Sequence, residues 1–193
     1  MVKPLEVGVR LTNQKVQFTA LTGVNPAITI DYVPPLGDGQ GCTPLEVLLV
    51  SLASCSGSTI VTLLRKMRKN VAGFGVKATG IRREVHPTSF QKITLEFTLM
   101  SADAAEADLQ KAIALSEETY CPVWAMLKNA VEIVTAYRIS TLKRITLSAP
   151  ASSLNDLSHG SGSGQYLLPL AQGLNTNPRQ ASRPQDHRQS PAS

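Results

Sequence analysis

The sequence predicts one domain of short strands and helices over residues 1–140, followed by a polar tail at residues 141–193. Two observations predict this division. Apolar residues recur at strand or helix spacing through the first 140 residues, whereas Pro, Ser, Gly and Gln accumulate after Ser140. The tail has too little apolar surface to offset the entropy cost of ordering it, so we expect it to be mostly disordered.

The N-terminal part of the domain predicts two or three antiparallel strands and then a long helix. Residues 5–33 alternate apolar and polar side chains in short runs that turn residues separate. The Pro- and Gly-rich residues 34–41 end strand structure. A helix is expected over 44–64, because Thr43 can serve as its N-cap, a proline occupies the first helical position and Glu46 stands in capping-box register.

This helix is apolar nearly all round and carries small residues suited to close packing, which predicts burial inside protein. Its glutamate, serines and threonines make it too polar for a membrane span, so we expect no membrane association.

The second half of the domain predicts strands on either side of two shorter helices. The expected helix in the middle is capped by Ser101 or Asp103, and the short third helix has Pro122 at its first position. Val123, Met126 and Leu127 are expected to point inward. The expected bounds are strands at 75–83 and 92–100, helices from 104 to about 118 and directly after Cys121, and a strand at 131–139.

Charge gives little sign of a nucleic-acid partner. The net charge is +5, but residues 1–140 hold 14 Lys and Arg against 12 Asp and Glu, a balance of +2. The one dense basic run, at 65–69, follows the long helix, where positive charge compensates the helix dipole. We therefore expect no nucleic-acid binding. The N-terminus has no signal-like apolar stretch, which favours the cytosol.

The three cysteines are the candidates for chemistry. A reducing cytosol favours catalytic or redox-sensing cysteines over a structural disulfide framework. No Cys-x-x-Cys pair occurs, so neither a metal nor another cofactor is expected. Cys121 precedes Pro122 at a helix start, where free N–H groups lower a thiol pKa. Cys55 is flanked by small residues that leave room for a substrate. The alternative is that both are buried, inert thiols, and Cys42 is read as structural.

Three segments resemble the OsmC/Ohr family, in the family's order. They are the helix segment 43–55 (TPLEVLLVSLASC), the segment 86–97 (HPTSFQKITLEF) and the segment 115–123 (LSEETYCPV). The resemblance covers about residues 3–140 and looks closest to the branch with Pro-x-Glu at the helix start. The tail resembles nothing in that family.

The resemblance implies an α+β fold in which antiparallel sheets wrap a long buried central helix in an intertwined homodimer. It also implies reduction of organic hydroperoxides at the subunit interface. Cys55 matches the cysteine that attacks the peroxide and becomes a sulfenic acid. Cys121 matches the cysteine that condenses with it to an intrasubunit disulfide, which an external dithiol then reduces. Helix-end electrostatics alone would instead make Cys121 the more acidic thiol.

The sequence departs from the family at the residues that assist the thiolate. Leu45 stands where the well-marked peroxidases have a glutamate, and Glu46 follows one position later, about half a turn out of phase with Cys55. Arg10 is the only arginine before the central helix. Glu46 and Arg10 are the candidate assisting residues. The departure also favours an alternative, a non-catalytic or thiol-switch protein that binds a small hydrophobic molecule at the dimer interface.

Overall fold

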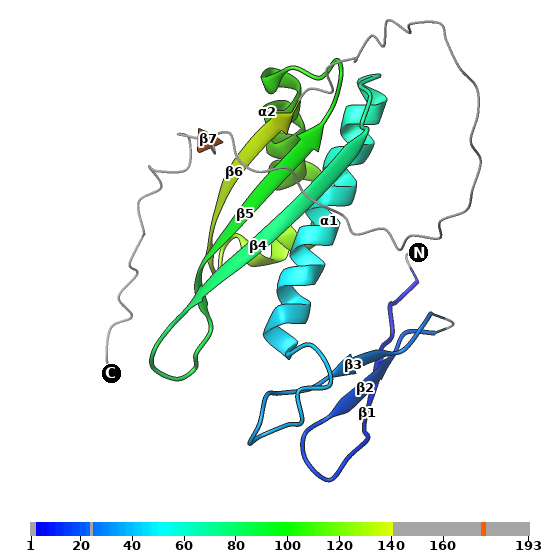
Figure 1. Cartoon of the computed structure of the whole chain (residues 1–193), viewed down its shortest axis with the longest axis vertical. Helices are drawn as coiled ribbons and strands as arrows, with labels where there is room; N and C mark the ends of the chain where they lie inside the picture. The colour runs from blue at the N-terminus through cyan, green and yellow to red at the C-terminus, as the bar shows by residue number, and fades with distance from the viewer. Residues whose placement is uncertain (1–2, 24, 141–174, 177–193) are drawn as a thin grey trace, which may run out of the picture.

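The computed structural model describes residues 3–23, 25–140 and 175–176 (Figure 1). The predicted disorder of the tail therefore falls almost entirely outside the described residues. In chain order the elements are β1 (Gly8–Leu11), β2 (Phe18–Leu21), β3 (Ile28–Ile30), α1 (Pro44–Lys66), β4 (Gly73–Arg82), β5 (Phe90–Met100), α2 (Glu106–Leu115), the π-helix η1 (Ser116–Tyr120), α3 (Pro122–Leu127), β6 (Glu132–Ser140) and β7 (Asn175–Thr176).

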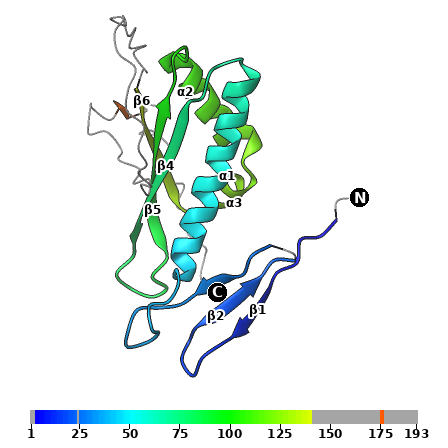
Figure 2. The ribbon, with the colours of Figure 1, turned by 45° about the vertical axis from the view of Figure 1, so that its right-hand side comes forward.

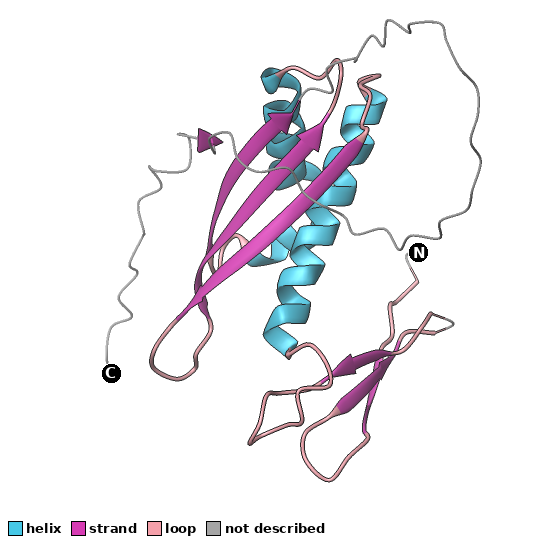
Figure 3. Ribbon diagram, in the orientation of Figure 1, coloured by secondary structure: helices cyan, strands magenta, loops and turns pink. Residues whose placement is uncertain are grey.

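The strands form two separate sheets, and the fold is α+β (Figure 3). The first sheet has the order β1-β2-β3 and the second β4-β5-β6-β7. The expectation of antiparallel sheets is wrong for one pair, because β6 runs parallel to β5. The cause is the connection between them: α2, η1 and α3 carry the chain back across the sheet, as a parallel pair requires.

The core lies between the second sheet and the helices, which gather on one side of that sheet (Figure 2). Alternate residues of β5 point into it and are fully buried, as the alternation at 93–99 predicts. Leu52, Ile60 and Leu64 of α1 meet them from the helix side, and Trp124 of α3 joins the same cluster. Gly57 lets α1 approach β4 closely, since an added Cβ would lie 3.0 Å from the Val76 side chain.

Helix α1 begins as the sequence predicts, with Thr43 as N-cap and a complete capping box to Glu46. Its burial differs from the prediction. Only 28% of its most apolar 18-residue window is buried, so within one chain the helix is covered along one face and not all round. By length and composition α1 is the one helix in the described part of the chain that could cross a membrane. One face of α1 packs against the sheet and is buried there, as in a core helix.

The β1-β2-β3 sheet lies beyond the N-terminal end of α1 (Figure 2), and we call it the arm. Opposed residues of neighbouring strands share a face, and the arm has one wholly apolar face. Val9 and Leu11 on this face are 61% and 51% exposed, so the residues that the structure describes leave much of it uncovered. Arg10 lies on the opposite face with Thr19. The apolar face consists of Val9, Leu11, Phe18, Ala20, Ile28 and Ile30.

Two local predictions in the second half are wrong. Helix α2 begins at Glu106 with Ala105 as N-cap, because Ser101 caps the preceding turn by accepting the Ala104 N–H at 3.0 Å. In α3, Met126 is 70% exposed, whereas Trp124 is fully buried. The large indole of Trp124 takes the inward position of this short helix, and Met126 points outward instead.

The loop between the arm and α1 is organised by a buried carboxylate. Asp31 is fully buried and accepts backbone N–H bonds from Tyr32 at 2.8 Å and from Asp38 and Gln40 at 3.1 Å. Burial raises the pKa of this carboxyl, but the three backbone donors and the Gln17 side chain together outweigh burial and hold the pKa below its ordinary value.

We expect Asp31→Asn to lower the melting temperature by several degrees near neutral pH, because an amide cannot accept all three N–H groups. Since the folded pKa is depressed, the carboxylate stabilises the fold above the ordinary pKa of about 3.9 and this contribution is lost as the pH falls through the folded pKa. Thermal unfolding against pH checks this. The exposed Asp38→Asn variant is the control, and equal pH dependence of the two variants would contradict the role of Asp31.

Candidate functional site

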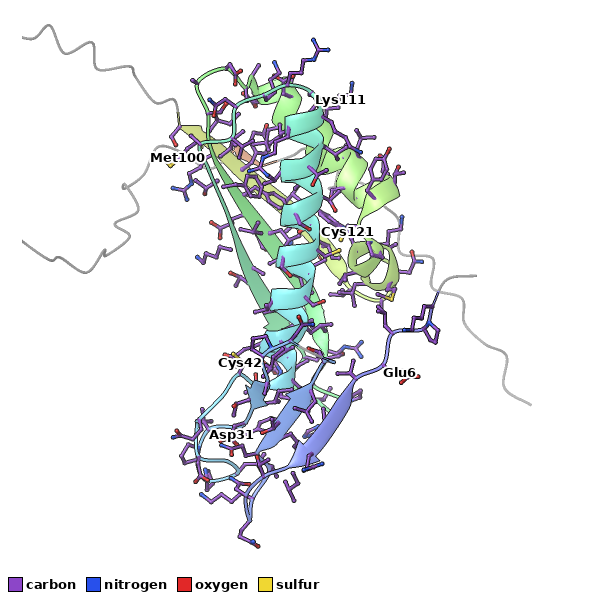
Figure 4. The ribbon with its side chains drawn as sticks, turned by 90° about the vertical axis from the view of Figure 1, so that its right-hand side faces the viewer. Glu6, Asp31, Cys42, Met100, Lys111 and Cys121 are labelled. Carbon is purple, nitrogen blue, oxygen red and sulfur yellow. The ribbon has the colours of Figure 1, made fainter. Side chains whose placement is uncertain are left out.

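The structure brings together two cysteines that lie 66 residues apart in sequence. The Sγ atom of Cys121 is 2.8 Å from the Sγ atom of Cys55. Cys55 projects from the middle of α1 and is half-buried, whereas Cys121 precedes α3 and is 2% exposed. Figure 4 shows Cys121 beside α1. The third cysteine, Cys42, is exposed near the start of α1 and remains a free thiol, as does the pair.

The π-helix η1 sets the position of Cys121. The Cys121 N–H donates to the carbonyl of Ser116 at 3.0 Å, which closes this wide turn. Cys121 is then extended (φ −87°, ψ 106°), as a residue before proline prefers, and Pro122 starts α3. The buried Ser116 hydroxyl also lies 3.5 Å from the carbonyl of Ser56, the neighbour of Cys55. Sequence reasoning missed this π-helix, although Pro122 signals that the helix before it must end.

Burial decides the electrostatics of Cys121. It raises the pKa of this thiol to about 11, and the adjacent Cys55 sulfur adds to the rise. The backbone N–H of Trp124, 3.4 Å from the Cys121 sulfur, and that of Val123 lower the pKa but do not compensate. Burial therefore outweighs the lowering of the Cys121 pKa that its position at a helix start predicts. Cys121 is a neutral thiol at physiological pH and donates to the Cys55 sulfur.

Glu46 and Arg10 lie away from the cysteine pair in this chain. The carboxylate of Glu46 accepts the N–H of Thr43 at 2.7 Å and its hydroxyl at 2.8 Å, and these bonds hold the pKa of Glu46 below its ordinary value. Arg10 lies with Thr19 on the face of the arm opposite its apolar face. A role for either residue beside Cys55 stays a prediction. Among the described residues, no three His, Cys, Asp or Glu side chains form a group that could hold a metal ion.

An apolar groove runs between α1 and β4. Its larger part has a volume of about 500 Å³, and an adjoining part of about 240 Å³ continues toward Glu46. Ala53 and Gly57 line it, and each is two residues from Cys55, so the groove and the sulfur lie on different faces of the helix. The larger part is lined by Val50, Ala53, Ser54, Gly57, Ser58, Val61, Phe74 and Val76.

The fold and the sulfur contact define a class: an α+β protein with one cysteine in a long helix and a second at the start of a short one. The OsmC-like protein family matches residues 37–136. The chain is 37% identical over 97 residues to the protein YhfA of Escherichia coli K12, which covers 50% of this chain and 72% of YhfA. The chain belongs to the OsmC-like protein family.

Solved structures agree with this assignment. A protein of Aquifex aeolicus superimposes with a TM-score of 0.65 at 30% identity, covering 74% of this chain and all of that one. An organic hydroperoxide resistance protein from Elizabethkingia anophelis superimposes with a TM-score of 0.55 at 12% identity, covering 74% of this chain and 99% of that one. The second match is a likeness of fold.

We expect Cys121 to resist alkylation until the pH approaches about 11. Because the folded pKa is raised, the buried neutral thiol stabilises the fold below the ordinary thiol pKa of about 8.5, and this contribution is lost as the pH rises through the folded pKa. Iodoacetamide labelling at about pH 8, read by peptide mass spectrometry, should be at least about tenfold slower at Cys121 than at Cys42. In denaturant both should react alike. Equal rates in the folded protein would contradict the burial argument.

Proposed function

We propose that this protein is a thiol peroxidase that reduces organic hydroperoxides. The observation that carries the proposal is the 2.8 Å contact between the sulfurs of Cys55 and Cys121. A sulfenic acid on one sulfur needs a second thiol within bonding reach to become a disulfide, and this distance is close to a covalent S–S bond of about 2.05 Å. The half-buried Cys55 is the sulfur that a substrate can reach, and the buried Cys121 is the one that resolves the intermediate.

The proposed cycle has three balanced steps. The thiolate of Cys55 attacks one oxygen of the O–O bond, the other oxygen leaves and takes up a proton as the alcohol, and Cys55 becomes a sulfenic acid. The thiol of Cys121 then attacks the Cys55 sulfur, and the hydroxyl leaves with a proton as water. An external dithiol finally reduces the disulfide to two thiols and is itself oxidised to a disulfide. No metal or organic cofactor takes part in these steps.

Family membership supports this reaction class. The chain carries both cysteines on the OsmC-like fold, and a protein with that fold from Elizabethkingia anophelis is named for organic hydroperoxide resistance. The neutral Cys121 thiol suits the resolving role, because it donates a hydrogen bond to the Cys55 sulfur instead of competing for the peroxide. We place this activity in the cytosol, where dithiol reductants maintain such pairs.

The working unit in this proposal is a homodimer. Much of the apolar face of the arm and the outer face of α1 is left uncovered by the described residues of one chain, and Val50 on α1 is 59% exposed. The small residues Ser54 and Ser58 stand one turn apart on that outer face of α1, which permits close helix–helix approach. A second copy would cover both surfaces with the same two surfaces of its own, as two-fold symmetry requires.

A second candidate is a non-catalytic or thiol-switch protein that binds a small hydrophobic molecule. The apolar groove of about 500 Å³ between α1 and β4 favours it, because this volume lies in the range of ligand pockets. The two candidates differ in one respect: binding in the groove does not require the cysteines, whereas peroxide reduction does.

Replacing either paired cysteine by serine should abolish catalysis. In a coupled assay of cumene hydroperoxide consumption, we expect Cys55→Ser to lower turnover by at least about a hundredfold, because the nucleophile is lost. Cys121→Ser should stop after one turnover and leave a sulfenic acid on Cys55 that dimedone traps. Cys42→Ser is the matched control and should keep the parent's rate. If Cys55→Ser and Cys121→Ser both turn over cumene hydroperoxide at the parent's rate, the peroxidase proposal is wrong. That result would favour the non-catalytic or thiol-switch protein.

Val50→Asp should convert the dimer to monomers. Val50 is largely exposed in the single chain, so the carboxylate costs the monomer little, whereas it would be buried and unpaired against a second α1. We expect the dissociation constant to rise by about a hundredfold or more, measured by size-exclusion chromatography with light scattering. Thr79→Asp, at an exposed position of β4 that does not line the groove, is the control. A monomeric parent, or a variant that stays dimeric, would contradict the proposed assembly.

A further inference from the structure

Ser116 contacts the backbone next to each cysteine of the pair. It is fully buried and is the first residue of the π-helix η1. Its carbonyl accepts the Cys121 N–H at 3.0 Å, and its hydroxyl lies 3.5 Å from the carbonyl oxygen of Ser56, which directly follows Cys55. The backbone and the side chain of one residue therefore link the two segments that present the sulfurs.

Both partners of the hydroxyl contact are held in place by their own helices. The Ser116 N–H donates to the carbonyls of Ala112 and Ile113 in the last turn of α2, and these two residues belong to the core. Ser56 is fully buried in α1, and its own hydroxyl donates to the Leu52 carbonyl at 2.8 Å. Because Ser116 and Ser56 are fully buried within one chain, a second subunit would not change the contact between them.

The contact between Ser116 and Ser56 is longer than a good hydrogen bond. Two oxygens joined by an O–H···O bond are commonly about 2.7–2.8 Å apart, whereas these two are 3.5 Å apart in the dithiol protein. A disulfide bond is shorter than the 2.8 Å contact between the two thiols. Closing that bond draws Cys121 toward α1, and the bond from the Cys121 N–H to the Ser116 carbonyl couples η1 to this movement.

We propose that Ser116 is a positioning residue of the cysteine pair, whose hydroxyl bonds more tightly to the Ser56 carbonyl in the disulfide than in the dithiol and so favours disulfide formation. An interaction that is stronger in one state shifts the equilibrium toward that state by the difference in its free energy. The inference rests on the disulfide of the proposed cycle but not on peroxide as the oxidant. In an exchange with oxidised dithiothreitol, the Cys55 and Cys121 thiols lose two protons and two electrons as their S–S bond forms. The S–S bond of the oxidant breaks and takes these up as two thiols.

The test measures the equilibrium between dithiol and disulfide in the folded protein, in buffers of graded oxidised and reduced dithiothreitol. Cys42→Ser serves as the parent, so that the pair holds the two remaining cysteines. Each mixture is approached from the oxidised and from the reduced side until both agree, and free thiols are then labelled in denaturant and counted by mass spectrometry. Ser116→Ala removes the hydroxyl and keeps the carbonyl. Ser56→Ala is the matched control, because it removes an equally buried hydroxyl beside Cys55 but keeps the carbonyl that Ser116 contacts.

We expect Ser116→Ala to lower the equilibrium constant for disulfide formation about fivefold, a shift of about 20 mV in the two-electron potential, and Ser56→Ala to change it by less than about twofold. A hydroxyl that only supports the fold would stabilise both redox forms alike and leave this constant unchanged. The inference would be overturned by equal constants for the parent and Ser116→Ala, by an equal fall in Ser56→Ala, or by a parent that forms no disulfide in the most oxidising buffer.

The parent protein allows a second measurement that holds even if Ser116→Ala fails to fold. The carbonyl ¹³C resonance of Ser56 should move downfield when the pair is oxidised, because a tighter hydrogen bond deshields the carbonyl carbon. The Leu52 carbonyl, which already accepts the Ser56 hydroxyl at 2.8 Å, should move less. A Ser56 resonance that stays in place or moves upfield would contradict the tighter bond. Neither measurement uses peroxide, so loss of the peroxidase proposal would leave both results unchanged, whereas equal constants for the parent and Ser116→Ala would leave that proposal standing.

Discussion

Packing of one face of α1 against the β4-β5-β6 sheet and the α2–α3 segment is the constraint on which the rest of the structure depends. Leu52, Ile60 and Leu64 hold the helix on the buried side of β5, and Gly57 brings it close to β4. This seating fixes the position of Cys55 along the sheet. The crossover that makes β6 parallel to β5 then carries Cys121 to the same helix, so the sulfur contact follows from the topology.

The local features of the chain could be predicted from its sequence wherever neighbours along the chain determine them. The capping box of Thr43 and Glu46 needs only three residues of spacing, and the alternation in β5 needs only a two-residue period. Both are present where the sequence places them. The short helix after Cys121 follows in the same way from Pro122.

Features that depend on distant contacts could not be predicted in this way. The inward face of α3 is set by the size of Trp124 and the space beneath it, which no six-residue pattern encodes. The acidity expected of Cys121 from its helix start is a local effect of about 1 kcal/mol, and burial in a core assembled from other elements outweighs it. The resemblance to a family, carried by motifs spread over the chain, supplied the pairing of the cysteines that local rules do not contain.

The apolar face of the arm is exposed while the protein is being synthesised. The strands of the arm precede α1 in the chain, so they leave the ribosome before α1 does, and in the described part of the chain Val9 and Leu11 on their apolar face stay exposed. Between synthesis and assembly, that face is open to any hydrophobic surface in the cell. In the proposed dimer each chain covers this face of the other, so the yield of usable protein would depend on how quickly one new chain meets another, and a higher rate of synthesis would shorten that interval.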